Sequence, residues 1–515
     1  MALAVLGLAM VGNGHAATAV QIYGPSSTLI GTGTGTRNIW VQVGSNPAVP
    51  GATCTIELYP YGTTGPVLYS GTAAVPNSTS TATQVMQVPI NVGQLGIYSL
   101  RVQVKNAGGG VVWTSNHRYA SVPPRANVGP PFMGVCTHLC YSISDPAARV
   151  LDLIRLAGFG WIRDNYWWDS IEPTAGTYTF NSHQDDIVSN AQSRGLKVLA
   201  ILGKATPAYN FTGGLPDSTT NAAFGRYAVK CMQRYPYVLD WEILNEPDDY
   251  DPTTVYTPLL QAVYNAMKTQ NSAVNVISCG GGGAGHNVGG QYESGVLGGG
   301  GIGYQNAFSA HPYLGDNPPE IGYTATGGPI TTFNVSTIWP YLTTLANNHP
   351  NPATGTLKVW MTEMGWSVYP DGETEMEQAA YFVRAYLLAA RQGWGTVSRL
   401  FWYEFQNGGT DTDQESNFGL INADYSPKPA YVAASVFSAS IGTYAFSQAV
   451  IDTSTAKVYK YGPRYAIWGV TGPTSVTFAL PAGTYTLRDW QGRDTTITST
   501  GTYTMTASIN PSYIF

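Results

Sequence analysis

The stretch 358–405 contains one complete unit of the predicted fold, namely KVWMTEMGW (358–366), a helix-length segment (376–392) and RLFWYEF (399–405). The two outer runs are apolar over the length of a strand, and the segment between them is amphipathic and is followed by Gly393 as a helix stop. A strand, a helix and a second strand in this order are typical of parallel strands joined by a crossover helix. The stretch therefore predicts a βαβ unit.

The same alternation extends over 132–440. Its strand-length runs are FMGVCTH (132–138), GWIRD (160–164), KVLAILG (197–203), LDWEILNE (239–246), VNVISCG (274–280), AFSAHPY (307–313), KVWMTEMGW and RLFWYEF. Candidate helices lie between these runs, for example 145–157, where Asp-Pro supplies an N-cap and a proline for the first turn. Because the runs number eight, we expect a (β/α)8 TIM barrel in an α/β fold.

The regions on either side of the barrel have a different pattern. Residues 19–122 and 444–515 consist of short alternating runs separated by turn residues, which predicts strands without helices. We expect an immunoglobulin-like β-sandwich before the barrel and a small β-domain after it. The Pro-rich segment SVPPRANVGPPF (121–132) is expected to be the linker. The predicted domains are a β-sandwich at 18–123, a catalytic barrel at 124–442 and a C-terminal β-sandwich at 443–515.

Composition narrows the range of partners. Only 11% of the 515 residues are charged, the formal net charge is −6, and no run of Lys and Arg occurs. A surface that neutralises phosphates is therefore not expected, and neither is a nucleic-acid partner. The chain has 34 Tyr and 13 Trp, which suits surfaces that stack on sugar rings and equally suits strands and cores.

The first residues, MALAVLGLAMVGNGHAA (1–17), form an apolar stretch that ends in small residues. The stretch is too short to span a bilayer and is typical of a secretory signal peptide, although no Lys or Arg precedes the apolar run. We therefore expect a secreted protein, either extracellular or periplasmic. No other stretch approaches the ~20 apolar residues of a membrane helix, so we expect no membrane span.

The cysteines argue against a metal centre. The chain has 5 Cys, an odd number, and contains no CxxC pair, which disfavours a zinc ribbon and a redox dithiol. In VCTHLC (135–140), Cys136, His138 and Cys140 alternate, but alternate strand positions supply no fourth ligand. We interpret this segment as a strand end with a disulfide as an option, and we expect neither a metal nor an organic cofactor.

In a barrel of this type the active site lies at the C-terminal ends of the strands, so the polar residues that end the apolar runs are the candidates. They are His138, Arg163, Lys204, Asn245, Glu246, His311, Tyr313, Glu363, Trp402 and Glu404. Glu246 and Glu363 each follow an apolar strand directly, where a charge is costly unless it is paired or exposed at the barrel mouth. Two carboxylates that face one cavity suit glycosidic cleavage, in which one group donates a proton and the other attacks the anomeric carbon.

Several of these residues resemble motifs of the clan A glycoside hydrolases. They are Asn-Glu-Pro (245–247) at the fourth strand, Glu363 at the seventh, Arg163 at the second and His-Pro-Tyr (311–313) at the sixth. Within that clan the chain is most similar to family 39 and related bacterial endoglycosidases over 132–440. The segments GFGWIRDNYWWDSIEP (158–173) and FGLINADYSPKPAY (418–431) carry this similarity.

The resemblance implies a retaining glycosidase of class EC 3.2.1.- that hydrolyses β-glycosidic bonds of an oligo- or polysaccharide. Glu246 would be the acid/base and Glu363 the nucleophile. Asn245 would bind the 2-hydroxyl of the sugar, Arg163 would keep Glu363 ionised, and Tyr313 would orient Glu363.

Four further residues are expected near the sugar. The resemblance implies that His138 and His311 line the sugar subsite and that Trp402 forms its floor. No motif assigns a role to Trp366. It follows a strand end, where it can either stack on a sugar or pack in the core.

Two other functions remain open at this point. One is a non-catalytic carbohydrate-binding or adhesive surface protein, and the presence of both carboxylates argues against it. The other is an exo-acting, β-xylosidase-like enzyme, which the loops between strands would decide. Lys204 and the Gly-rich segments 280–285 and 298–303 depart from the commonest family pattern, and this leaves the substrate open rather than the reaction.

Overall fold

The computed structural model describes residues 17–22, 29–80, 82–125, 129–130, 132–141, 147–203, 206–209, 218–249, 252–281, 291–324, 330–349, 357–392, 397–409 and 412–515. The predicted signal peptide (1–17), except for Ala17, and Lys204 lie outside these residues, as do the Asp-Pro pair at 145–146 and Gly393. No helix in the described part of the chain is long and apolar enough to cross a membrane.

Eight parallel strands close into the predicted barrel. Around the barrel they are β9 (Met133–Cys136), β10 (Trp161–Trp167), β11 (Lys197–Gly203), β12 (Asp240–Ile243), β13 (Asn275–Gly281), β14 (Ala307–Ala310), β17 (Lys358–Met364) and β18 (Val397–Trp402). Closure comes from β18, which pairs with β9 and places Leu400 opposite Met133. Each strand overlaps one of the predicted runs, so the (β/α)8 prediction is confirmed.

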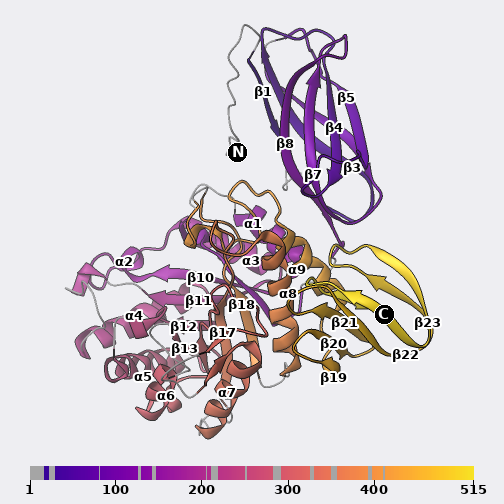
Figure 1. The fold of residues 1–515 in the computed structure, drawn as a ribbon. Coiled ribbons are helices and arrows are strands. Elements are labelled where there is room, and N and C mark those ends of the chain that lie inside the picture. The colour runs from indigo at the N-terminus through magenta and orange to yellow at the C-terminus, as the bar shows by residue number, and fades with distance from the viewer. Residues whose placement is uncertain are drawn as a thin grey trace.

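Helices surround the barrel on its outside (Figure 1). They are α1 (Ala147–Ala157), α2 (Trp168–Ile171), α3 (Ser182–Ser193), α4 (Ser218–Arg234), α5 (Thr253–Gln270), α6 (Gln291–Gly298), α7 (Val335–Asn348), α8 (Glu375–Arg391) and α9 (Pro429–Ser440). The start of α8 is a capping box, in which Thr374 Oγ1 accepts from the Glu377 N–H at 3.2 Å and Thr374 N–H donates to Glu377 Oε2 at 2.9 Å. A short hairpin of β15 (Tyr323–Thr324) and β16 (Thr332–Phe333) precedes α7.

The barrel interior is built in layers because alternate residues of a strand point to the same side. The lower layer is apolar and contains Trp161, Trp360 and Phe401, with the two tryptophan rings 5.5 Å apart. Gly134 makes room for this layer, since a Cβ at that position would lie 2.4 Å from the Phe401 ring. The next layer along the same strands is polar and buried. It consists of Arg163, Glu242, Ser309 and Thr362.

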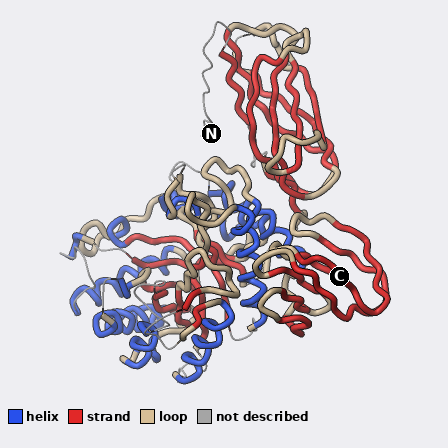
Figure 2. Tube along the Cα trace, in the orientation of Figure 1, coloured by secondary structure: helices blue, strands red, loops and turns tan. Residues whose placement is uncertain are grey.

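The region before the barrel is the predicted β-sandwich. One sheet contains β1 (Ala17–Ile22), β3 (Gly35–Asn46) and β6 (Gln84–Val92), and the other contains β2 (Ile30–Thr32), β8 (Val111–Val122), β7 (Gly96–Lys105), β4 (Thr53–Pro60) and β5 (Tyr69–Ala74). Both sheets contribute to one apolar core, for example through Val41 and Val88 from the first and Ile56 and Val102 from the second. Figure 2 shows the helices gathered in the barrel, whereas this region consists of strands and loops.

The region after the barrel forms the predicted C-terminal β-domain, and its strands belong to one hydrogen-bonded sheet. Its strand order is β19 (Phe446–Asp452), β20 (Ala456–Tyr461), β21 (Arg464–Gly469), β24 (Ser512–Ile514), β22 (Thr474–Arg488) and β23 (Asp494–Ala507). The strands form one sheet because β24 pairs with both β21 and β22 and so joins the two halves. On one face of the sheet, Tyr461 and Trp468 join the core of the barrel domain. On the other face, Ile467 of β21 belongs to a separate apolar core with Val476 and Phe478 of β22.

The sandwich also contacts the barrel. Arg118 forms an ion pair of 2.6 Å with Glu375 at the start of α8, and Tyr61 donates a hydrogen bond to the same carboxylate. The Ile97 N–H donates to Gln491 Oε1 of the C-terminal region at 3.2 Å. The β-sandwich is therefore held against both other parts of the chain.

We predict that Trp360→Ala lowers the free energy of unfolding of the barrel by about 3–5 kcal/mol, because it leaves a large cavity in the apolar layer. Urea denaturation followed by circular dichroism measures this change. Val111→Ala is the control, because the Val111 side chain is 51% exposed and its truncation should change stability by less than about 0.5 kcal/mol. An unchanged unfolding midpoint for Trp360→Ala would contradict the importance of this layer.

Candidate active site

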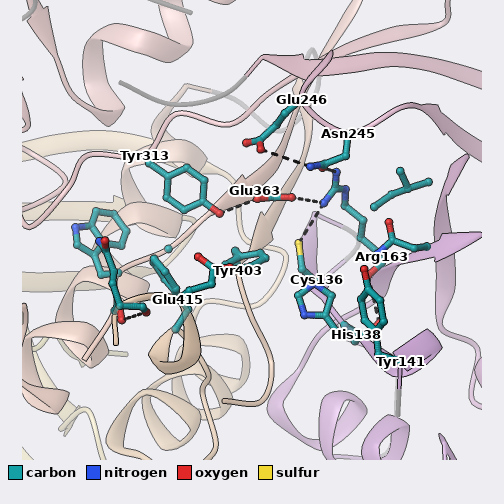
Figure 3. A pocket seen from close by; sticks show the side chains of 18 of the residues that line it. Cys136, His138, Tyr141, Arg163, Asn245, Glu246, Tyr313, Glu363, Tyr403 and Glu415 are labelled. Carbon is teal, nitrogen blue, oxygen red and sulfur yellow. Dashed lines mark hydrogen bonds and ion pairs between the residues drawn. The ribbon is translucent and has the colours of Figure 1, made fainter. Parts of the chain in front are cut away.

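A cavity of about 450 Å³ opens above the polar layer, at the C-terminal ends of the barrel strands. Seven of the predicted site residues line it: His138, Arg163, Asn245, Glu246, Tyr313, Glu363 and Trp366. Figure 3 shows Glu246, Glu363 and Arg163 side by side, with Tyr313 and Tyr403 nearby. The structure thus brings together residues that five different strands or their following loops supply.

Arg163 connects the groups at the floor of the cavity. Its NH1 group donates to Glu363 Oε1 at 2.5 Å, its Nε to Glu242 Oε2 at 2.6 Å and its NH2 group to Asn245 Oδ1 at 2.7 Å. Tyr313 donates its hydroxyl to the second oxygen of Glu363, Oε2, at 2.7 Å. Both oxygens of Glu363 are therefore held in a fixed position beneath the cavity.

Glu363 is set up as an ionised carboxylate. Burial raises its pKa, but the charges of His311 and Arg163 and the hydrogen bond from Tyr313 outweigh burial, so the pKa lies below its ordinary value. A negative charge at this position is what an attacking nucleophile needs. The roles expected for Arg163 and Tyr313 agree with these contacts.

His311 contacts the second carboxylate and is buried, with 1% of its surface exposed. Its Nδ1 lies 2.8 Å from Glu246 Oε1 and its Nε2 lies 3.0 Å from Thr362 Oγ1. The Thr362 hydroxyl donates its single hydrogen to Glu242 Oε1 at 2.8 Å, so Nε2 of the histidine must be the donor to Thr362. This arrangement leaves Nδ1 facing Glu246.

The electrostatics of His311 reflect both carboxylates. Burial lowers its pKa, but the charge of Glu363 and the hydrogen bond with Glu246 outweigh burial, and the pKa lies above the ordinary histidine value. His311 Nδ1 also lies 3.7 Å from Glu363 Oε2. His311 therefore lies behind the two carboxylates and couples them, whereas the sequence predicted that it lines the sugar subsite.

Gly280 explains how the His311 ring fits at this position. A Cβ at residue 280 would lie 2.2 Å from His311 Nε2, which no side chain tolerates. The glycine of the VNVISCG run is therefore required by the close approach of the histidine ring, and not by a turn.

The backbone on either side of Asn245 is unusual. Leu244 has φ +64° and Glu246 has φ +46°, a left-handed conformation that residues other than glycine rarely adopt. Such strain persists where the surroundings enforce it and is concentrated at functional sites. Here it places Asn245 against Arg163 and Glu246 against His311 at the end of one short strand.

Glu246, His311 and Glu363 offer ligand atoms that all lie within 4.8 Å of one another, a spacing that can also hold a metal ion. In this protein the cation beside Glu363 is the guanidinium of Arg163, and Nδ1 of His311 is engaged by Glu246. We therefore interpret the cluster as a site of proton transfer and nucleophilic attack.

Aromatic residues form one wall of the cavity, but Trp402 is not among them. Tyr403, the next residue, lines the cavity and contacts the rings of His138, Tyr313 and Phe418. Trp402 is 1% exposed and stacks behind Trp366, with ring centroids 5.9 Å apart. Because neighbouring strand residues point to opposite sides, the prediction that Trp402 forms the floor was wrong by one position.

His138 lines the cavity and pairs with Glu404, with 2.8 Å between Nδ1 and Oε2. Burial lowers the pKa of His138, but the hydrogen bond and the charge of Glu404 outweigh it, and the pKa lies above the ordinary value. The pKa of Glu404 is raised by burial, which the contact with His138 opposes in part. Glu404 therefore fixes the orientation of His138 from outside the cavity.

The two cysteines of VCTHLC are free, so the disulfide option is wrong. Cys136 points into the barrel, where its Sγ donates to the Thr362 carbonyl at 3.3 Å, and Cys140 lies in the turn after β9. The two sulfur atoms are apart because Cys136 faces the barrel interior and Cys140 belongs to the segment after the strand.

Several functional residues were not predicted. The cavity is also lined by Tyr141, Asp316, Tyr403, Glu415 and Phe418, which come mainly from loops that carry no strand pattern. Glu242 and Thr362 lie inside the apolar runs, within the buried strands β12 and β17. A charged residue in the middle of a buried run was the signal that could have identified Glu242.

Comparison with known proteins places this site in a family. A sequence model of the cellulases (glycosyl hydrolase family 5) matches residues 125–390. Among solved structures, a family 39 glycoside hydrolase from the gut symbiont Bacteroides cellulosilyticus WH2 is 32% identical with a TM-score of 0.84, and the match covers 96% of this chain and 99% of that chain. No curated protein matches the chain significantly.

More distant structures share the fold alone. A glucosidase from Croceicoccus marinus is 13% identical with a TM-score of 0.52, covering 76% of this chain and 96% of that chain. A family 51 α-L-arabinofuranosidase from Bifidobacterium longum is 16% identical with a TM-score of 0.50, covering 76% of this chain and 97% of that chain. The chain therefore belongs to the clan A glycoside hydrolases and shares nearly its full length with a family 39 enzyme.

Proposed function

We propose that this glycosidase cleaves β-glycosidic bonds of an oligo- or polysaccharide with retention of configuration, by double displacement. One observation carries the proposal: a carboxylate oxygen of Glu246 and one of Glu363 lie within 4.8 Å of each other. Retaining glycosidases hold their two carboxyl groups about 5–5.5 Å apart, whereas inverting enzymes need about 6.5–9.5 Å to admit a water molecule. We infer the β linkage from the family resemblance. We also propose that the protein is exported, because residues 1–17 are apolar and end in small residues.

In the first step Glu363 attacks the anomeric carbon and forms a glycosyl ester, while the bond to the leaving oxygen breaks. Glu246, which contacts His311, donates a proton to that oxygen. In the second step a water molecule attacks the anomeric carbon, Glu246 takes the proton of the water, and Glu363 leaves as a carboxylate. Arg163 and Tyr313 stabilise the charge of Glu363 before the first step and after the second.

Asn245 is oriented for a contact with the sugar. Its Oδ1 accepts from Arg163, so its amide nitrogen, which is 3.5 Å from Glu246 Oε2, faces the cavity. This nitrogen is the donor that we assign to the 2-hydroxyl, a contact that strengthens in the oxocarbenium-like transition state.

The cavity favours an uncharged sugar. Asp316 and Glu415 add two carboxylates to its lining. Among the described lining residues, the cationic groups are those of Arg163 and His138, and carboxylates already engage both. A sugar acid would find repulsion there rather than a counter-charge.

The first test uses Glu246→Gln and Glu363→Gln on a panel of 4-nitrophenyl β-glycosides and soluble polysaccharides, with the product configuration followed by NMR. We expect wild type to give the retained product, Glu246→Gln to lose on the order of 10²–10⁴ in rate and Glu363→Gln to lose more. Asp316→Asn, which alters another carboxylate of the cavity, is the matched control and should keep the mechanism. An inverted product, or activity that survives both Gln substitutions, would refute the proposal.

A second prediction concerns pH. Tyr313→Phe removes a donor to Glu363 and so raises the pKa of that carboxyl, and the reaction needs its ionised form. The acid limb of the pH profile of kcat/KM should therefore move to higher pH, with a loss on the order of 10-fold to 100-fold near neutral pH. Tyr141→Phe, in a tyrosine that makes ring contacts with His138 and Trp167, should leave the acid limb in place. An unshifted limb in Tyr313→Phe would contradict the assigned hydrogen bond.

A third prediction concerns Gly280→Ala, whose added methyl group displaces the His311 ring and disturbs its contact with Glu246. A displacement of about 1 Å costs on the order of 10²-fold in rate, so kcat should fall by that amount. Gly298→Ala is the control, because a Cβ there meets nothing within 4 Å. Equal kcat values for the two variants would show that the position of His311 is not limiting.

A further inference from the structure

A groove of about 940 Å³ lies between the N-terminal sandwich and the barrel. Its sandwich side includes Tyr61, Arg101 and Asn116, and its barrel side includes Asn422 and Asp424 from the loop before α9. Figure 1 shows the sandwich standing next to α9, with β7 and β8 running toward the barrel. The groove is therefore formed by two separate parts of the chain.

The strand register determines which side chains face the groove. In the five-stranded sheet, Arg101 of β7 lies opposite Glu57 of β4 and Asn116 of β8. The intervening residues, such as Leu100 and Val102, are buried in the sandwich core. The outer face of the sheet consequently carries a row of hydrogen-bonding groups.

The charges of this row are already balanced. Arg101 is held by Glu57 at 2.6 Å and lies 4.9 Å from the centroid of the Tyr59 ring, while Arg118 is held by Glu375. Paired guanidinium groups offer little to an anion but retain N–H groups that can donate to hydroxyls. The exposed side chain of Asn116 adds a donor and an acceptor. This chemistry suits an uncharged polyol chain.

A smaller cavity of about 340 Å³ adjoins the catalytic cavity. It shares Thr137, His138 and Tyr141 with the catalytic cavity. On its other side its lining includes Ala423, whose two neighbours in the chain, Asn422 and Asp424, line the groove. The loop at 422–424 therefore lines both the smaller cavity and the groove.

We propose that these hollows form a single path for an uncharged polysaccharide, along which the sandwich supplies distal binding subsites for the chain that the barrel cleaves. The inference rests on the proposed function and extends it to long substrates. The catalytic cavity has to hold the reacting sugar only, and a chain that leaves it past His138 and Tyr141 continues toward Asn116 and Arg101. The sandwich is then part of the substrate site and not a spacer.

The test compares binding and cleavage in a groove variant, Asn116→Ala/Asn422→Ala, with one substitution on each wall. Its control is Gln87→Ala/Asn91→Ala, which truncates two exposed residues of the other sandwich sheet. Binding is measured in the Glu363→Gln background by affinity electrophoresis in gels containing xylan, mixed-linkage β-glucan, mannan or galactan. Two lost hydrogen bonds of ordinary strength correspond to about tenfold in affinity.

We expect at least one polysaccharide to retard the parent and the control equally, and the groove variant about tenfold more weakly. With Glu363 intact, the groove variant should lose about tenfold in kcat/KM on that polysaccharide and cleave the matching 4-nitrophenyl glycoside at the wild-type rate. Absence of retardation by every polysaccharide, or equal retardation of all proteins, overturns the path while cleavage of the aryl glycoside still supports the proposed function. Retardation that depends on the groove without any cleavage by wild type supports the path and overturns the proposed function.

Discussion

The rest of the site depends on the ion pairs and hydrogen bonds of the buried Arg163 guanidinium. It binds Glu242 and Asn245, in and just after β12, and Glu363 of β17 at once. Breaking a buried pair of this kind leaves an uncompensated charge and costs about 3–5 kcal/mol. The apolar layer of Trp161 and Trp360 lies below it and keeps water from the ion pairs. The barrel can therefore hold an ionised carboxylate in its interior, which an apolar core alone would exclude.

The same centre gives the two carboxylates different properties. Glu363 is buried between the guanidinium of Arg163 and the hydroxyl of Tyr313, which both donate to it. The Glu246 side chain is 25% exposed and contacts His311. His311 is held in one orientation by Thr362, which in turn donates to Glu242. A continuous set of hydrogen bonds thus runs from Glu246 through His311, Thr362, Glu242 and Arg163 to Glu363. The two glutamates therefore differ because of their surroundings and not because of their residue type.

Much of this could be predicted from the sequence, because strand periodicity and the polar residues at strand ends are local features. Eight apolar runs predicted the barrel, and Glu246, Glu363, Arg163 and Tyr313 meet at one cavity. Trp402 and Tyr403 could not be distinguished, because the regular alternation of a strand gives no guide at its last residue. His311 was placed on the wrong side of Glu246, since its direction depends on Gly280 and Thr362, which are distant in sequence. The strand order of the C-terminal sheet depends on pairing between β24 and two remote strands, which no local sequence pattern predicts.

The position of β24 in the middle of the C-terminal sheet has a consequence for biosynthesis. The barrel strands can pair once the ribosome has passed β18, but the sheet that covers α8 needs Ser512–Ile514 to connect its two halves. Tyr461, which donates to the Leu387 carbonyl of α8, belongs to a sheet that stays incomplete until those residues emerge. During translation, one side of a nearly finished barrel therefore remains uncovered and open to chaperones.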